Sequence, residues 1–132
     1  MNQLQNFIFN GNEFRAILKD NQPWFIAKDV CDILGINNVS LAVNGRERIN
    51  KEGQKYWSGG LDDDEKLMLT VSISGQNREV LFVNEYGLYN LILKSHKPEA
   101  KQFKRWVTHD VIPSIRKHGA YMTPEKIEEV LL

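Results

Sequence analysis

Basic residues gather in the last third of this sequence. Between positions 94 and 118 there are seven lysines and arginines against two acidic residues, although the whole chain carries 17 of each kind. Lys97, Lys101, Lys104 and Arg105 are three or four residues apart or adjacent, which places them on one face of a helix, and Lys94 lies just before them. Such a surface attracts phosphate even when the net charge is zero. A solvated helix face or a protein contact would give the same pattern.

A second candidate surface lies between positions 28 and 43, where apolar residues at helical spacing surround Gly35. This layout is typical of a helix-turn-helix, whose second helix can enter the major groove of DNA. The polar residues offered there are Asn37, Asn38, Ser40 and Asn44, followed by Arg46 and Arg48. Asparagine can pair with adenine, and arginine with guanine or phosphate. Two ordinary packed helices would share this pattern.

Acidic residues and histidines, the residue types suited to catalysis, do not have the spacing of a catalytic or metal site. The acidic run from Asp62 to Glu65 could hold a divalent cation, as in a metal-dependent nuclease, but consecutive acids usually form a solvated turn and lack the calcium-loop spacing. His96, His109 and His118 have no cysteine nearby and do not share a helical turn. We therefore expect a protein that is not an enzyme and needs no cofactor.

The elements that position these residues begin with short strands. Asn10-Gly11 between residues 7–9 and 14–18 predicts a β-hairpin, and a turn at 19–23 leads to a third strand at 24–26. Helices are predicted from Ala27 to Gly35 and roughly from Val39 to Asn44. Residues 67–74 and 79–83 predict a second hairpin.

The middle of the chain, residues 46–66, has the composition of turns and loops, and we expect a mobile connection there. Tyr56 and Trp57 lie in this polar segment, where an exposed aromatic side chain would indicate a partner contact. Trp24 and Trp106, in contrast, are predicted to lie in the core.

The last third is predicted to be helical. Asn84 is an N-cap candidate, and Pro98 is well placed to start a further helix. That helix should stop or bend at Ile112, because Pro113 lacks an N–H group and crowds the preceding turn. Residues 114–118 then form a last turn or two closed by Gly119. A further helix is expected from Thr123.

Composition indicates one α+β domain of antiparallel β-hairpins, or a small sheet, packed with helices that include a helix-turn-helix-like pair. The 132 residues are 42% hydrophobic, which is enough for a single core. Cys31 is the only cysteine, so no internal disulfide can form. No apolar run approaches the length of a membrane span, and no signal peptide is recognisable. These features predict a cytoplasmic protein without membrane contact.

Four segments resemble, in order and spacing, the N-terminal domain of the BRO family. They are residues 23–35 (PWFIAKDVCDILG), 83–92 (VNEYGLYNLI), 95–107 (SHKPEAKQFKRWV) and 111–121 (VIPSIRKHGAY). The similarity covers about residues 5 to 122. It implies a nucleic-acid-binding domain that, in phages and prophages, acts as an antirepressor inside the bacterial host, and it implies no cofactor.

We therefore predict a DNA-binding transcription regulator that helps to relieve lysogenic repression. The Bro-N-like domain would span residues 1–122, and 123–132 would begin a helix or linker to a further C-terminal region. Double-stranded DNA is the expected partner, and paired half-sites would suit a homodimer. The alternative is a protein-interaction module that inactivates a phage repressor without contacting DNA.

Overall fold

The computed structural model describes residues 4–118. The turn expected at Gly119, the helix expected from Thr123 and the linker at 123–132 lie outside the described residues.

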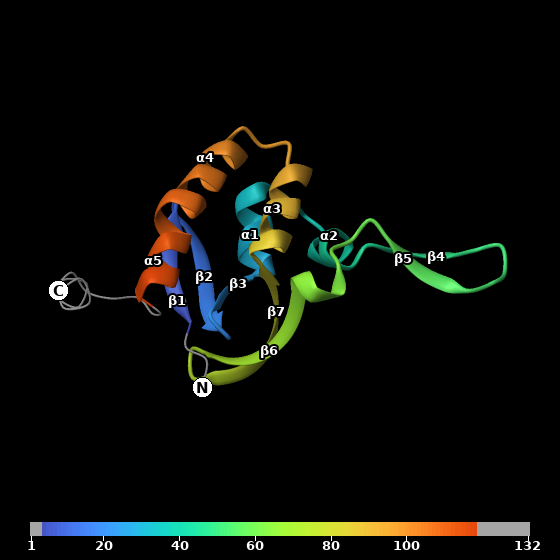
Figure 1. Ribbon diagram of the computed structural model, residues 1–132, viewed down its shortest axis with the longest axis horizontal. Coiled ribbons are helices and arrows are strands. Elements are labelled where there is room, and N and C mark those ends of the chain that lie inside the picture. Colours follow the sequence, from blue (N-terminus) through green and yellow to red (C-terminus); the bar gives the residue numbers. More distant parts are fainter. Residues whose placement is uncertain (1–3, 119–132) are drawn as a thin grey trace.

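A five-stranded antiparallel sheet forms one layer of the molecule (Figure 1), in the strand order β1-β2-β3-β7-β6. Its strands are β1 (Gln5–Phe9), β2 (Asn12–Lys19), β3 (Gln22–Ile26), β6 (Lys66–Ile73) and β7 (Gln76–Asn84). Asn10 and Gly11 both adopt positive φ in the first hairpin, and Ser74 and Gly75 do so in the β6–β7 hairpin. Two consecutive residues at positive φ give the tight turn whose twist matches that of paired strands. The predicted hairpins are thus confirmed.

Helices form the second layer, and consecutive helices follow β3 and β7. They are α1 (Ala27–Leu34), α2 (Val39–Asn44), α3 (Glu85–Lys94), α4 (Glu99–Trp106) and α5 (Ile112–His118). Gly35 ends α1 in the left-handed conformation, with φ 71°. The side chains of Asn38 and Asn84 accept hydrogen bonds from the backbone N–H groups of Leu41 and Gly87, so they cap α2 and α3. The α+β prediction, the bounds predicted for α1 and α2 and the N-cap predicted at Asn84 are confirmed.

The main core lies between the sheet and the helices. Phe14 and Phe25 stack in the sheet with ring centroids 5.0 Å apart, and the Phe103 ring of α4 meets Phe14 edge-on at 5.2 Å. Trp106 packs against Phe9 at 5.3 Å and is half-buried, so it belongs to this core as predicted. Trp24 packs instead on a smaller cluster at the opposite face of the sheet.

Residues 46–66 were predicted to form an irregular, mobile connection, and the structure is different there. Residues 46–58 form a second sheet of two strands, β4 (Arg46–Ile49) and β5 (Lys55–Ser58). This hairpin, which we name the arm, projects from the body of the molecule (Figure 1). The reason for the error is physical. Nearly every side chain of the arm is exposed, so neither strand shows the apolar alternation that a half-buried strand requires.

The helix at the C-terminal end of the described region was predicted to stop or bend at Ile112. It does not stop there: it continues from α4 to α5, and its regular geometry is interrupted by a π-helical turn at Val107–Val111. The Ile112 N–H donates to the Val107 carbonyl five residues earlier. This wider turn precedes Pro113, which lacks an N–H group, and such turns relieve the crowding that a proline ring causes. Asp110, in this π-helical turn, is exposed.

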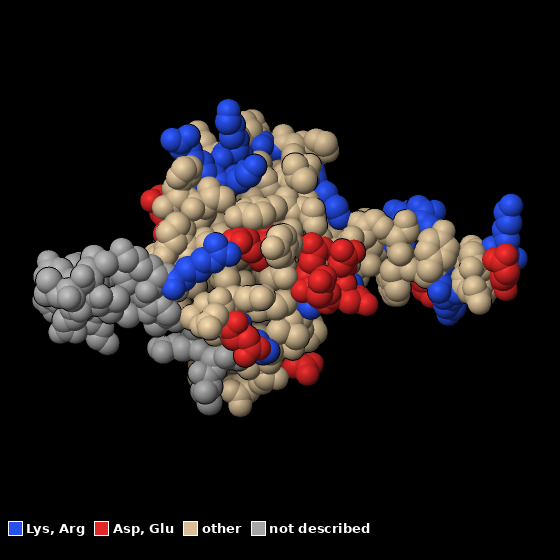
Figure 2. Space-filling model, viewed as in Figure 1, with Lys and Arg blue, Asp and Glu red and all other residues tan. Residues whose placement is uncertain are grey.

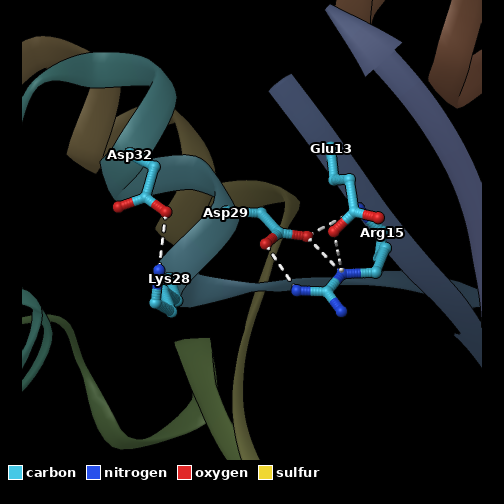
Figure 3. Close-up of polar contacts among 5 residues, drawn as sticks. All are labelled: Glu13, Arg15, Lys28, Asp29 and Asp32. Atoms are coloured by element: carbon cyan, nitrogen blue, oxygen red, sulfur yellow. Dashed lines mark hydrogen bonds and ion pairs between the residues drawn. The ribbon is translucent and has the colours of Figure 1, made fainter. Parts of the chain in front are cut away.

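An ion pair fixes the first helix to the sheet. Asp29 of α1 accepts hydrogen bonds from the Arg15 backbone N–H at 3.0 Å, from Nε at 2.9 Å and from Nη2 at 2.9 Å (Figure 3). The Asp29 side chain is only 5% exposed. The hydrogen bond to Asp29 is the main cause of a raised pKa of Arg15, so its guanidinium group keeps its charge. The ion pair therefore sets where α1 begins on the sheet.

Candidate nucleic-acid interface

A groove separates α2 from the arm, and we name it the arm groove. Ten residues line it: Ile36, Asn38, Leu41, Ala42, Gly45, Arg46, Arg48, Ser58, Gly59 and Lys94. Three of these ten are cations, and this described lining includes no Asp or Glu. Its volume of about 690 Å³ is that of a cleft for an extended ligand rather than a single ion.

A second hollow continues the arm groove toward α4. It shares Ile36 and Lys94 with the arm groove and adds His96, Lys97 and Pro98 from the loop between α3 and α4. Ser95 holds this loop in place, because its hydroxyl donates to the Leu34 carbonyl at 2.7 Å. The cationic lining thus extends from the arm to the start of α4.

The basic face of α4 lies next along this surface. Lys101, Lys104 and Arg105 are all exposed, and Phe103 on the opposite side is fully buried. Figure 2 shows Lys and Arg side chains gathered over α4 at the top of the view, and the acidic side chains of the body concentrated lower down, near η1 (Asp63–Glu65). Lys101, Lys104 and Arg105 share one face of α4 as predicted, whereas Lys97, predicted on the same helix face, lies in the loop before α4.

Lys94 joins the parts of this surface. Its Nζ donates to the Ala42 carbonyl at 3.1 Å and to the Gly59 carbonyl at 2.6 Å, which links α3 to α2 and to the base of the arm. A lysine ammonium group has three donors, so one remains for a ligand. The sequence predicted Lys94 as a phosphate contact but gave no sign of this bridging position.

The predicted polar residues of the helix pair occupy different positions. Asn37 and Ser40 are exposed at the start of α2. Asn38 uses its side-chain oxygen to cap α2, so it is less free to form the two bonds that pair asparagine with adenine. Asn44 is half-buried: its oxygen accepts from Lys66 at 3.3 Å and its amide lies 3.4 Å from the Ser40 hydroxyl. Its contacts are therefore internal.

The arm supplies site residues that the sequence did not show as a group. In the β4–β5 register, Arg46 pairs with Ser58 and Arg48 with Tyr56, so these four side chains share one face. Both arginines and Ser58 line the arm groove, which identifies this inner face as the one toward α2. The available signal was the pair of four-residue segments 46–49 and 55–58 around the turn-forming residues 50–54.

The acidic run at 62–65 has a structural position. The Glu65 carboxylate is buried, accepts from the Asp62 N–H at 2.9 Å and from the Asn90 amide at 3.1 Å, and so closes the turn before β6. Within residues 4–118, no three His, Cys, Asp or Glu side chains are grouped as metal ligands would be. No helix in that part of the chain is both long and apolar enough to cross a membrane.

These observations define a class of protein: a small α+β domain with an extended surface, built from α2, the arm and α4, on which cations gather. The model of the BRO family N-terminal domain (Bro-N) matches residues 13–113, and the chain belongs to this family.

Several proteins share this similarity over most of the chain. Bro-N domain-containing protein 201R of Invertebrate iridescent virus 6 is 33% identical over 92% of the chain, and an uncharacterized protein of Haemophilus influenzae is 34% identical over 96%. The chain spans 31% of the length of the first and 58% of the second. No solved structure gave a significant match to this chain.

Proposed function

We propose that this domain binds double-stranded DNA as a transcription regulator of the phage antirepressor type and catalyses no reaction. The observation that supports it is the arm groove with its adjoining hollow. Four cations, Arg46, Arg48, Lys94 and Lys97, line these two depressions without an acidic residue among the lining side chains. Phosphate is the ligand that such a lining favours, and the α4 cations extend it over further phosphates.

The binding mode follows from the shapes of the two parts. A phosphate strand would lie in the arm groove, with Asn37 and Ser40 at the exposed end of α2 directed toward base edges. Lys101, Lys104 and Arg105 would hold neighbouring phosphates. Because α2 has only six residues, most of the affinity would come from phosphate contacts rather than from base contacts.

A salt-series titration tests this proposal. Fluorescence anisotropy with a random-sequence duplex should show binding that weakens steeply as salt rises. The double substitution Lys101→Glu with Lys104→Glu should reduce affinity roughly tenfold or more, uniformly across sequences.

The matched control is Lys19→Glu with Arg78→Glu, which changes the net charge equally at the sheet. It should lose much less affinity, because neither residue lies on α4 or in the groove. Equal losses in the two double variants would show that net charge alone decides, and would remove α4 from the interface. An absence of binding at low salt would overturn the proposal.

The second candidate function is direct capture of a phage repressor protein without DNA contact. The outer face of the arm favours it, since Ile49 is 66% exposed and Trp57 is 64% exposed there. Exposed tryptophan is a frequent anchor of protein interfaces. A purified lysogenic repressor should then be retained by this domain after nuclease treatment, and Trp57→Ala should abolish retention. Clear DNA binding without repressor capture would exclude this candidate.

The proposed role places the domain in the cytoplasm of a bacterial host. Regulators that bind paired half-sites do so as dimers, and a homodimer is therefore part of the proposal. Sedimentation of the DNA complex would show whether one or two copies occupy a site.

A further inference from the structure

Hydrogen bonds hold the arm at its tip and at its base, although nearly all of its side chains are exposed. At its tip the Asn50 side chain accepts hydrogen bonds from the backbone N–H groups of Glu52 and Gln54, and the Asn50 N–H donates to the Gln54 carbonyl. At its base the Leu61 N–H donates to the Val43 carbonyl at 2.8 Å. The arm is therefore held at a fixed position relative to α2.

Two glycines allow this close base. A Cβ atom added at Gly60 would lie 2.4 Å from the backbone of Asn44, and one added at Gly45 would lie 2.5 Å from the Ser58 carbonyl oxygen. Only residues without side chains permit the two chain segments to approach so closely. The width of the arm groove is consequently set by backbone contacts rather than by adjustable side chains.

The inner face of the arm carries two arginines at different depths. Arg46 lies next to the base, opposite Ser58, and Arg48 lies two residues farther toward the tip, opposite Tyr56. Two residues of extended strand correspond to roughly 7 Å. Both arginines line the groove, and Arg48 is farther along the arm from its base than Arg46.

Because of the geometry of DNA, Arg46 and Arg48 would contact different parts of the duplex. One phosphate strand separates the major groove from the minor groove, so a protein with α2 on one side of that strand has the arm on the other side. The minor groove is about 6 Å wide, which is too narrow for a two-stranded ribbon but admits an arginine side chain.

We propose that Arg46 holds the phosphate strand in the arm groove while Arg48 enters the adjacent minor groove. This inference rests on the proposed DNA binding. Adenine–thymine pairs present only acceptors in the minor groove, whereas guanine adds an amino group that is itself a donor. An arginine at this position therefore favours base pairs that lack the guanine amino group.

The test compares two alternating duplexes of equal length, dG-dC and dI-dC. Inosine lacks the minor-groove amino group of guanine but leaves the major-groove edge unchanged. The wild-type domain should bind the dI-dC duplex about tenfold more tightly. Arg48→Gln should abolish this preference. Arg46→Gln should weaken binding to both duplexes by the same factor and keep the preference.

Lys55→Gln is the matched control, because Lys55 lies on the outer face of the arm and is paired with Glu47 at 3.4 Å. It should keep the preference for dI-dC, and circular dichroism should show that all variants fold. Equal wild-type affinity for the two duplexes would overturn the assignment of Arg48 and leave DNA binding intact. Failure to bind either duplex would overturn both proposals together.

Discussion

The Lys94 ammonium group connects three elements that are far apart in the sequence. Its bonds to the carbonyls of Ala42 and Gly59 bring α3, α2 and the base of the arm together at one point. The same group lines both depressions of the proposed interface. Residue type alone indicated a phosphate contact, but the bridging position depends on residues 35 and 52 positions away in the chain. Such a role cannot be inferred from local spacing.

The two carboxylates of α1 provide a stability prediction at this scale. Asp29→Ala should lower the free energy of unfolding by about 2–4 kcal/mol, because it leaves the partly buried Arg15 without its partner. Asp32→Ala is the control on the same helix (Figure 3), and its bond to Lys28 is exposed on both sides. It should cost less than about 0.5 kcal/mol. Urea unfolding measures both, and similar values would contradict this assignment.

Cys31 gives a prediction that depends on pH. Burial raises the pKa of its thiol to about 11, so at pH 8 the folded protein holds the unreactive protonated form. A disulfide reagent should therefore react with Cys31 only after unfolding. Since the folded state binds this proton more tightly than the unfolded state does, stability should fall as pH rises from about 9 toward 11. Cys31→Ser should remove that contribution, and rapid labelling of the native protein would contradict the buried position.

At the scale of elements, strands and helices with one buried face were predictable. Phe14 and Ala16 face the helices while Ile17 faces the opposite cluster, and this alternation reports burial directly. The arm carries no such record, because both of its faces are exposed. Its strands are fixed by the Asn50 turn and by the contact between Gly45 and Gly60, which joins residues 15 positions apart. The part of the proposed interface on α4 was therefore predictable from a local sequence pattern, whereas the arm has no such pattern and was missed.

The importance of the close backbone contact at the base of the arm can be tested by adding one methyl group there. Gly60→Ala should push the arm away from Asn44, lower the free energy of unfolding by about 1–3 kcal/mol and weaken DNA binding. The control is Gly75→Ala in the β6–β7 turn, where a Cβ atom meets nothing within 4 Å and the cost is only that of a positive φ, about 1 kcal/mol. DNA affinity should survive Gly75→Ala, because Gly75 lies outside both depressions. Thermal unfolding and anisotropy, measured on both variants, would contradict the argument if Gly60→Ala kept full affinity.

For the whole molecule, zero net charge conceals a strongly uneven surface. The cations of α4 and of the arm groove lie on one connected surface, and acidic side chains gather away from it, at η1. Such separation orients the molecule toward a polyanion during encounter, because the local field rather than the total charge acts at short distance. The chain belongs to the Bro-N family by similarity. The arrangement of its charges is the physical feature that supports the DNA binding proposed for it.

The number of phosphates engaged can be counted from the salt dependence of binding. Apart from Arg48, which is assigned to the minor groove, six exposed cations of the proposed interface can contact phosphate: Arg46, Lys94, Lys97, Lys101, Lys104 and Arg105. If all six displace counterions, the slope of log affinity against log salt should be about −5. Lys101→Gln with Lys104→Gln should reduce its magnitude by about 2. A slope near zero, or one unchanged in the double variant, would show that α4 does not contact phosphate.

The backbone contact between Gly45 and Gly60 has a consequence for the kind of duplex that fits. Because α2 and the arm are joined by this close backbone contact, the arm groove has a set width. It fits a phosphate strand only where the nucleic-acid grooves on either side of that strand have matching width and depth. An RNA duplex has a deep, narrow major groove and a broad, shallow minor groove, the reverse of the proportions in B-form DNA. An arm groove that fits B-form DNA does not fit an RNA duplex. This domain would therefore distinguish DNA from RNA by the shape of the duplex, without contacting a ribose hydroxyl.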